Sequence, residues 1–271
     1  MTGWIANARM YSPAPEAAAA WRRLFDIVSD RSGIALTVID HAYPAPLWEL
    51  SRRDDLACAM MCGWPYALEG RRKKLVAAPV SADPAAAGKP VYRSLFVVRR
   101  ESRFAALEDT FGHRMGFTVA DSHSGCNAPR FHLLSHRAAR GARLFAEVIG
   151  SIPTPRLMIE AVRDGRVDVG PVDSFAFDLL SHHAPDLVRA VRVIDATEPA
   201  TIPAFVASPA CPDDTVAALA EALCTVAEDP GSAALLDDLC IKAFARVGPT
   251  DYRTHERWAQ AAEDAGYGVI A

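Results

Sequence analysis

Residues 121–125 read Asp-Ser-His-Ser-Gly, a short polar segment with the donors needed to bind an anion. It follows an apolar run containing Met115, Phe117 and Val119, and a helix-like segment with Pro129 in its first turn comes next. Backbone N–H groups at a helix start lack intrahelical acceptors, hydroxyls add donors, and glycine permits close approach of a ligand. Each hydrogen bond to a charged group contributes about 1.5–3 kcal/mol. The segment therefore predicts an oxyanion site without lysine, and a plain polar turn with an N-cap serine is the alternative.

Three further side chains stand where predicted strands end. Tyr11 and Tyr43 each follow a strand-like run, so that a phenol could cover a ligand, or the ring could be a half-buried structural group. Asp173 follows a buried strand and could face a cleft or cap the next helix. Ligands of open α/β sheets bind at the carboxyl ends of the strands, which makes all three candidates for ligand contact.

The sequence contains only incomplete motifs for catalysis or for metal binding. His132 and His136 have the i, i+4 spacing of metal ligands, but neither an HExxH glutamate nor a third ligand accompanies them. Ser124 lacks the first glycine of the G-x-S-x-G nucleophile motif, and spacing identifies no partner base. The sequence therefore predicts no catalytic residue, no metal and no cofactor.

The composition restricts the class of protein. The chain has 271 residues, 51% of them hydrophobic and 23% charged, with a net charge of −4, which is typical of a folded globular protein. The single basic run at 71–74 has no interleaved aromatic residues, so no nucleic-acid partner is expected. No apolar run approaches the ~20 residues of a membrane span, so membrane insertion is not expected either. Because the first residues lack the pattern of a secretory signal, the chain as written predicts a cytoplasmic protein, or a periplasmic one if a signal was removed.

Strands alternate with helices along most of the chain, which predicts βαβ units and a largely parallel α/β fold. The expected strands cover 4–10, 34–39, 56–61, 75–80, 92–99, 115–119, 144–149, 167–170 and 188–194. After an extended segment at 199–208 the rest is expected to be helical, at 214–228, 231–242 and 251–264. This order predicts one lobe made of 1–99 plus 200–271 and a second, inserted lobe at 100–199 that carries the anion loop.

Four motifs in a fixed order then point to a family. They are Val91-Tyr92-Arg93-Ser94 with the strand that follows, the run from Glu101 to Arg114, the segment Asp121–Gly125, and Gly165-Arg166-Val167-Asp168. Together they resemble the phosphate/phosphite/phosphonate class of periplasmic-type substrate-binding proteins of ABC importers. The resemblance implies a two-lobed, type II periplasmic-binding-protein-like fold with two hinge-crossing strands and an oxyanion at the lobe interface.

The resemblance also implies roles for particular residues. Ser122, Ser124 and the Gly125 amide match the donors of the family's Ser-Thr-Ser-Gly loop, and His123 replaces its threonine, with an imidazole donor as the substitute. Tyr43 and Tyr92 match tyrosines that meet the ligand from the first lobe. Asp173 stands near the acidic positions that bind the amine of aminoalkylphosphonates, while the histidine of those members is missing around residue 151.

The function that this implies is capture of a small oxyanion, such as a phosphonate, phosphate or phosphite, for an ABC-type importer whose permease would be the partner. The protein would not be an enzyme. Two alternatives stay open at this point: an enzyme of the same fold in cofactor-precursor biosynthesis, and a cytoplasmic ligand sensor.

Overall fold

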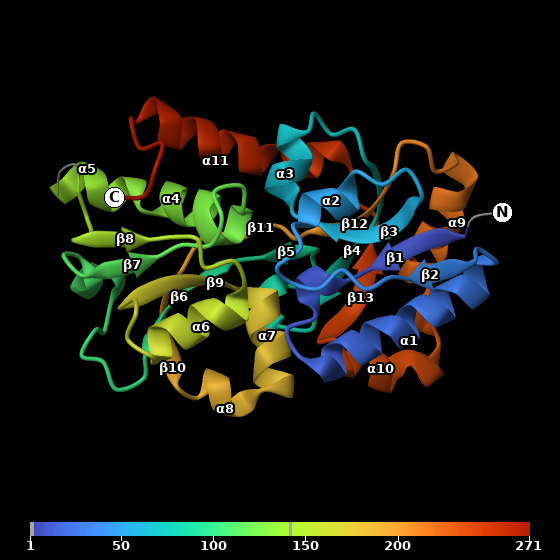
Figure 1. The fold of residues 1–271 in the computed structure, drawn as a ribbon, viewed down its shortest axis with the longest axis horizontal. Coiled ribbons are helices and arrows are strands. Elements are labelled where there is room, and N and C mark those ends of the chain that lie inside the picture. Colours follow the sequence, from blue (N-terminus) through green and yellow to red (C-terminus); the bar gives the residue numbers. More distant parts are fainter. Residues whose placement is uncertain (1–2, 141–142) are drawn as a thin grey trace. The chain divides into compact units, whose positions relative to one another are not determined.

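The computed structural model describes residues 3–140 and 143–271, and the chain divides into two compact units (Figure 1). The first unit contains residues 1–91 and 201–252, and the second contains 92–200 and 253–271. The expectations about the first two residues lie outside the described part. The unit boundaries differ from the expected ones, because residues 92–99 and the C-terminal helix belong to the second unit rather than the first.

The sheet of the first unit has the strand order β13-β4-β12-β3-β1-β2. Strand β1 pairs in parallel with β2 and β3, whereas β12 pairs antiparallel with β3 and β4, and β13 antiparallel with β4. The strands are β1 (Trp4–Asn7), β2 (Leu36–Val38), β3 (Leu56–Met61), β4 (Lys74–Ser81), β12 (Ala204–Ala207) and β13 (Ile241–Ala245).

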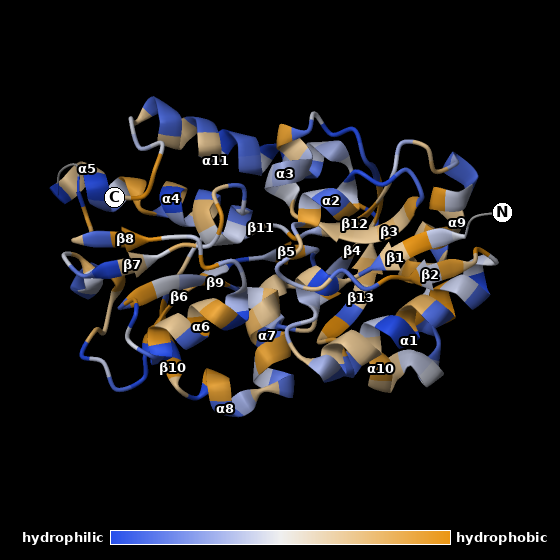
Figure 2. Cartoon of the chain, in the orientation of Figure 1, coloured by the Kyte–Doolittle hydropathy of each residue, from blue (hydrophilic) through white to orange (hydrophobic). Residues whose placement is uncertain are grey.

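Helix α1 (Pro15–Ser32) covers this sheet and provides much of its core. Its buried positions recur at helical spacing, and the rings of Trp21 and Phe25 meet Phe205 of β12 edge-on at centroid distances of 5.7 and 5.5 Å. Figure 2 shows the matching hydrophobic colours along β3 and β12. The other helices of the unit are α2 (Leu47–Ser51), α3 (Gly63–Leu68), α9 (Asp213–Cys224) and α10 (Ala233–Asp238).

The sheet of the second unit has the order β10-β6-β9-β7-β8. Strand β6 pairs antiparallel with β9 and β10, and β7 pairs in parallel with β8 and β9. The strands are β6 (Ser94–Arg99), β7 (Arg114–Gly116), β8 (Glu147–Ile149), β9 (Val169–Asp173) and β10 (Val191–Ala196). Two short strands, β5 (Val91–Tyr92) and β11 (Ala200–Thr201), form a separate ladder.

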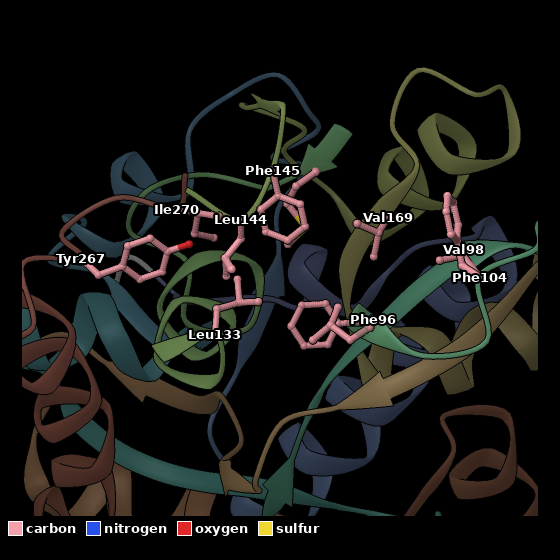
Figure 3. Close-up of a cluster of buried hydrophobic side chains, with 11 residues drawn as sticks. Phe96, Val98, Phe104, Leu133, Leu144, Phe145, Val169, Tyr267 and Ile270 are labelled. Atoms are coloured by element: carbon pink, nitrogen blue, oxygen red, sulfur yellow. The ribbon is translucent and has the colours of Figure 1, made fainter. Parts of the chain in front are cut away.

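Helices cover both faces of this second sheet (Figure 1). One face packs on α4 (Ala128–His132), α5 (Leu134–Arg140) and the segment after α11 (Arg253–Asp264), and the other on α6 (Pro155–Arg163), α7 (Ser174–His183) and α8 (Pro185–Val188). Helix α11 packs on α4. Figure 3 shows the core on the first face, where Tyr267 and Ile270 of the C-terminal segment lie beside Leu133 and Leu144, and Phe96 of β6 lies beyond Leu133 in the same cluster. The last residues of the chain are thus part of the second unit's core.

Several predicted elements need correction. The segment 231–242 is not one helix, because α10 ends at Asp238 and β13 begins at Ile241. The strand predicted at 167–170 begins later and extends to Asp173. By contrast, the predicted strand at 56–61 matches β3, and the predicted N-cap Thr154 of α6 accepts a hydrogen bond from Leu157 N at 3.1 Å. Within the described ranges, no helix combines the length and the apolar character that a membrane crossing requires.

Candidate anion-binding site

The predicted anion loop folds into η4 (His123–Asn127), a single π-helical turn with Ser122 as its N-cap. The Ser122 Oγ accepts a hydrogen bond from the Gly125 N–H at 3.0 Å, and its carbonyl accepts one from Asn127 N at 3.0 Å. The Gly125 amide, expected as a ligand donor, is therefore used inside the loop. The Ser122 hydroxyl is thus used here as an acceptor, and ligand contact by Ser122, Ser124 and Gly125 stays a prediction.

Gly125 has a steric role in this turn. A Cβ atom built on it would lie 1.8 Å from the Thr118 Oγ1, and Thr118 N donates to the Gly125 carbonyl at 3.2 Å. No side chain fits in this space, so the turn can close against the segment after β7 only with glycine here.

Asp173 lies beside Ser124 of this turn. The Ser124 hydroxyl donates to the Asp173 carboxylate at 3.4 Å, although the two residues are 49 positions apart. Asp173 is buried and also caps α7, accepting from Ala176 N at 3.0 Å, so the capping alternative holds as well. Its register partner on β6 is Ser94. Cross-strand partners lie on the same face of a sheet, so Ser94 and Asp173 lie on one face.

His123, expected as an imidazole donor to a ligand, is buried within the second unit. The ring is 1% exposed and lies against His255 of α11 at a centroid distance of 3.7 Å, with Trp258 stacked at 5.4 Å and Tyr92 at 6.1 Å. Burial, and secondarily the neighbouring His255, hold the pKa of His123 well below its ordinary value. Burial therefore disfavours a charged imidazole, and the ring packs inside the unit rather than at its surface. Donation from this ring to a ligand stays a prediction.

The tyrosines of the site prediction have different environments. Tyr92 is buried in the second unit beside His123. In the first unit, Tyr11 is 1% exposed, which agrees with the alternative that its ring is a structural group. Its carbonyl accepts a hydrogen bond from the Trp21 indole at 2.7 Å. Tyr43, by contrast, is 54% exposed. Ligand contact by these three phenols stays a prediction.

The family model for "ABC transporter, phosphonate, periplasmic substrate-binding protein" matches residues 10–252. The chain belongs to this family. Its members are substrate-binding proteins of transporters rather than enzymes, and their description as periplasmic gives no support to the cytoplasmic expectation. No curated protein matches the chain significantly in sequence.

Solved structures show the type II periplasmic-binding-protein fold of the family. The binding protein component of an ABC phosphonate transporter from Pseudomonas aeruginosa superposes with a TM-score of 0.80 at 17% identity, covering 97% of this chain and 88% of that one. PhnD1 from Prochlorococcus marinus, in complex with methylphosphonate, gives 0.76 at 16% identity, with 96% and 98% covered. The aliphatic sulphonate binding protein SsuA from Escherichia coli gives 0.60 at 14% identity, with 97% and 86% covered.

Two buried hydroxyls near the family's anion loop were missed in the sequence. The Oγ atoms of Ser94 and Thr118 have no hydrogen-bond partner among the described residues. Ser94 could have been found from the Tyr92-x-Ser94 alternation, which places both side chains on one face of an extended segment. Thr118 could not, because its position against Gly125 depends on the π-helical turn.

Other polar groups of the second unit are occupied elsewhere. His132 bonds Asp195 at 2.8 Å and His136 lies 3.4 Å from Glu108, and the described residues contain no cluster that could hold a metal ion. A cavity of about 280 Å³ lies in the same unit but includes none of the predicted ligand residues. Its lining residues are Phe131, His132, Leu134, Ser135, Thr197, Glu198 and Trp258.

Proposed function

We propose that this protein captures a small oxyanion of the phosphonate class in the periplasm and delivers it to an ABC importer, without catalysing a reaction. Family membership supports the transport role, and the bound methylphosphonate of the Prochlorococcus marinus relative supports the ligand class. The two units would act as the two lobes of the fold. A ligand would favour the closed state by the difference between its affinities for the two states.

The observation that carries the ligand assignment is the convergence of Ser122, Ser124 and Asp173. Two hydroxyl donors lie in one tight turn, and the second reaches a carboxylate from another strand. Hydroxyls can donate to the oxygens of a phosphonate, phosphate or sulfonate group. The Ser124 hydroxyl donates to Asp173, and an oxyanion bound at the turn would take over this hydrogen bond.

The test is calorimetric titration of the wild type and of the Ser122→Ala/Ser124→Ala double variant with methylphosphonate, phosphate, phosphite and methylsulfonate. Loss of two hydrogen bonds of about 1.5–3 kcal/mol each should weaken binding by a factor of 10² or more. Thr154→Ala is the matched control, because it removes a similar helix cap from α6, at a cost of about 1 kcal/mol, but no ligand donor. Equal affinities of wild type and double variant would contradict the proposed role of the turn.

A further inference from the structure

Three aromatic side chains form a stack beneath the anion loop, which we call the histidine stack: His123, His255 and Trp258. The imidazole centroids are 3.7 Å apart with the rings tilted by 44°, and Trp258 is stacked on His123 at 5.4 Å with its ring inclined by 17°. Phe131 covers the other side of Trp258 at 4.9 Å and 3°. The stack joins the anion loop to α11, an element more than 120 residues later in the chain.

A side-chain amide connects the stack to the loop backbone. The Asn127 Nδ2 lies 3.1 Å from the His123 Nδ1 and donates to the His255 carbonyl at 2.9 Å. An amide nitrogen can only donate, so the His123 Nδ1 is the acceptor and carries no proton in this arrangement. His123 is also the residue between Ser122 and Ser124, so a displacement of its ring displaces both hydroxyl donors.

Charge on the stack is unfavourable. His123 and His255 are 1% and 0% exposed, so a proton on either ring would be buried, and a second proton would repel the first at 3.7 Å. Protonation of Nδ1 would also turn the acceptor of the Asn127 bond into a donor. The ionisable groups on the surrounding elements are Tyr92 of β5, Asp173 of β9, Asp121 and Cys126 beside the turn, Arg130 and His132 of α4, and Arg253, Glu256, Arg257, Glu263 and Asp264 of α11. Arg130 pairs with Glu263 at 2.8 Å.

We propose that the histidine stack positions the anion loop, and that protonation of the stack in acid releases the loop and so weakens oxyanion capture. The part concerning capture rests on the proposed function. His123 is in this view a positioning residue: it holds Ser122 and Ser124 in place from behind and does not touch the ligand.

The direction of the pH effect follows from proton linkage. The ordered loop requires neutral imidazoles, whereas a released loop exposes them to water, where they take up protons near pH 6.5. The ordered loop is thus fully favoured above this pH. Below it, the ratio of ordered to released loop falls up to tenfold per pH unit for each histidine that gains a proton on release.

The experiment measures the affinity for methylphosphonate between pH 5 and 8 for the wild type, for His123→Phe/His255→Phe and for His136→Phe. The double variant keeps two aromatic rings in contact but cannot be protonated there. It also loses the Asn127 acceptor, so its affinity at pH 8 should fall by up to tenfold. Comparing variants at one pH cancels the titration of the ligand itself. His136 lies on α5 of the same unit, outside the stack, and serves as the matched control.

The expected result is a wild-type affinity that falls in acid relative to the double variant, with His136→Phe following the wild type. The protection of the Ser122–Gly125 amides against hydrogen exchange, taken relative to their intrinsic exchange rates at each pH, should fall below pH 6.5 in the wild type and not in the double variant. If the double variant fails to fold, the single variant His255→Phe takes its place. The number of protons linked to the loss of affinity in acid should then be one smaller in His255→Phe than in the wild type, and an equal number would overturn the proposal.

Two outcomes separate this inference from the proposed function. A wild type that binds methylphosphonate with the same acid dependence as the double variant would overturn the positioning role and leave the function intact. A wild type that binds no oxyanion at pH 8 would overturn the function, and the exchange measurement would still decide whether the stack holds the loop.

Discussion

At the scale of single residues, Asp173 is a capping group and a negative charge beside the predicted oxyanion donors. Asp173→Asn should keep the cap of α7, because Asn caps helices as well as Asp does. The substitution should also remove a negative charge that repels an anion. It would free the Ser124 hydroxyl from its carboxylate acceptor. At an effective dielectric constant of about 20, two charges about 6 Å apart repel by about 3 kcal/mol. We therefore expect tenfold or tighter binding of methylphosphonate, measured by calorimetry.

The same substitution distinguishes ligand classes. A ligand with a protonated amine would lose a favourable charge in Asp173→Asn, so 2-aminoethylphosphonate should bind more weakly while methylphosphonate binds more tightly. Unchanged affinities for both, in a variant with a wild-type melting temperature, would show that Asp173 acts only as a helix cap.

Gly125 gives a second prediction at this scale, concerning stability. Gly125→Ala places a Cβ atom 1.8 Å from the Thr118 Oγ1, so backbone or strand must shift, at a cost of 1–3 kcal/mol or more. Urea unfolding should show this loss, and Thr118→Gly in the same chain should restore part of it. Gly3→Ala is the control, because its nearest contact would be an ordinary 3.4 Å. A Gly125→Ala protein as stable as the wild type would mean that the turn does not close against Thr118.

At the scale of elements, Asp168 joins β7 to the segment that leads into β9. Its carboxylate accepts from the Arg114 backbone N at 2.9 Å and from two guanidinium nitrogens at 3.0 Å. Burial raises the pKa of Asp168, but the hydrogen bonds from Arg114 outweigh it and hold this pKa below its ordinary value. The stabilisation is therefore present above about pH 4 and is lost as pH falls through the lowered pKa.

Asp168→Asn should accordingly lower the free energy of unfolding at pH 7 by about 1 kcal/mol. This is less than a buried charged hydrogen bond would contribute, because the Arg114–Asp168 pair is partly exposed to solvent. The difference from the wild type should shrink when urea unfolding is repeated near pH 3. Asp164→Asn removes the exposed pair with Arg163 and should leave stability unchanged. A pH-independent loss in Asp168→Asn would argue for packing rather than charge.

The sequence predicted correctly those helices and strands whose ends and faces depend on residues near each other in the chain. The helix cap at Thr154 and the apolar strand β3 both depend only on residues that are adjacent in the sequence. Strand β13 was missed because the apolar residues after Gly231 continue a helical pattern, and only pairing with β4 makes Ile241–Ala245 a strand. The inward ring of His123 was missed for the same reason, since the groups that hold it come from α11.

At the scale of the whole molecule, the family motifs predicted the fold, and the chain's path between the two units differs from the expected one. The chain passes from one unit to the other at 91/92, 200/201 and 252/253. The third passage could not be read from helix periodicity, because an amphipathic helix such as α11 does not reveal which sheet it covers. Its destination depends on contacts with α4 and with the anion loop.

The third passage makes the C-terminal segment essential to the second unit. Residues 253–271 provide His255 for the histidine stack, Glu263 and the Gly268 carbonyl for Arg130, and the Ala271 carbonyl for Leu144 N. A chain that ends at Tyr252 should lose these bonds together with the core side chains Tyr267 and Ile270, which lie among Leu133, Leu144 and Phe145 in Figure 3.

We expect this truncated chain to lose ordered structure in the second unit while the first unit keeps its fold. Hydrogen exchange should become fast in β7, β8 and α4, with β3 and β12 still protected, and oxyanion binding should disappear. The full-length Val269→Ala protein is the control, because Val269 is 74% exposed and its loss leaves the core intact. Had α11 belonged to the first unit, as its place in the sequence suggests, the truncation would instead release β3 and β12, and protection of β7 and β8 would persist.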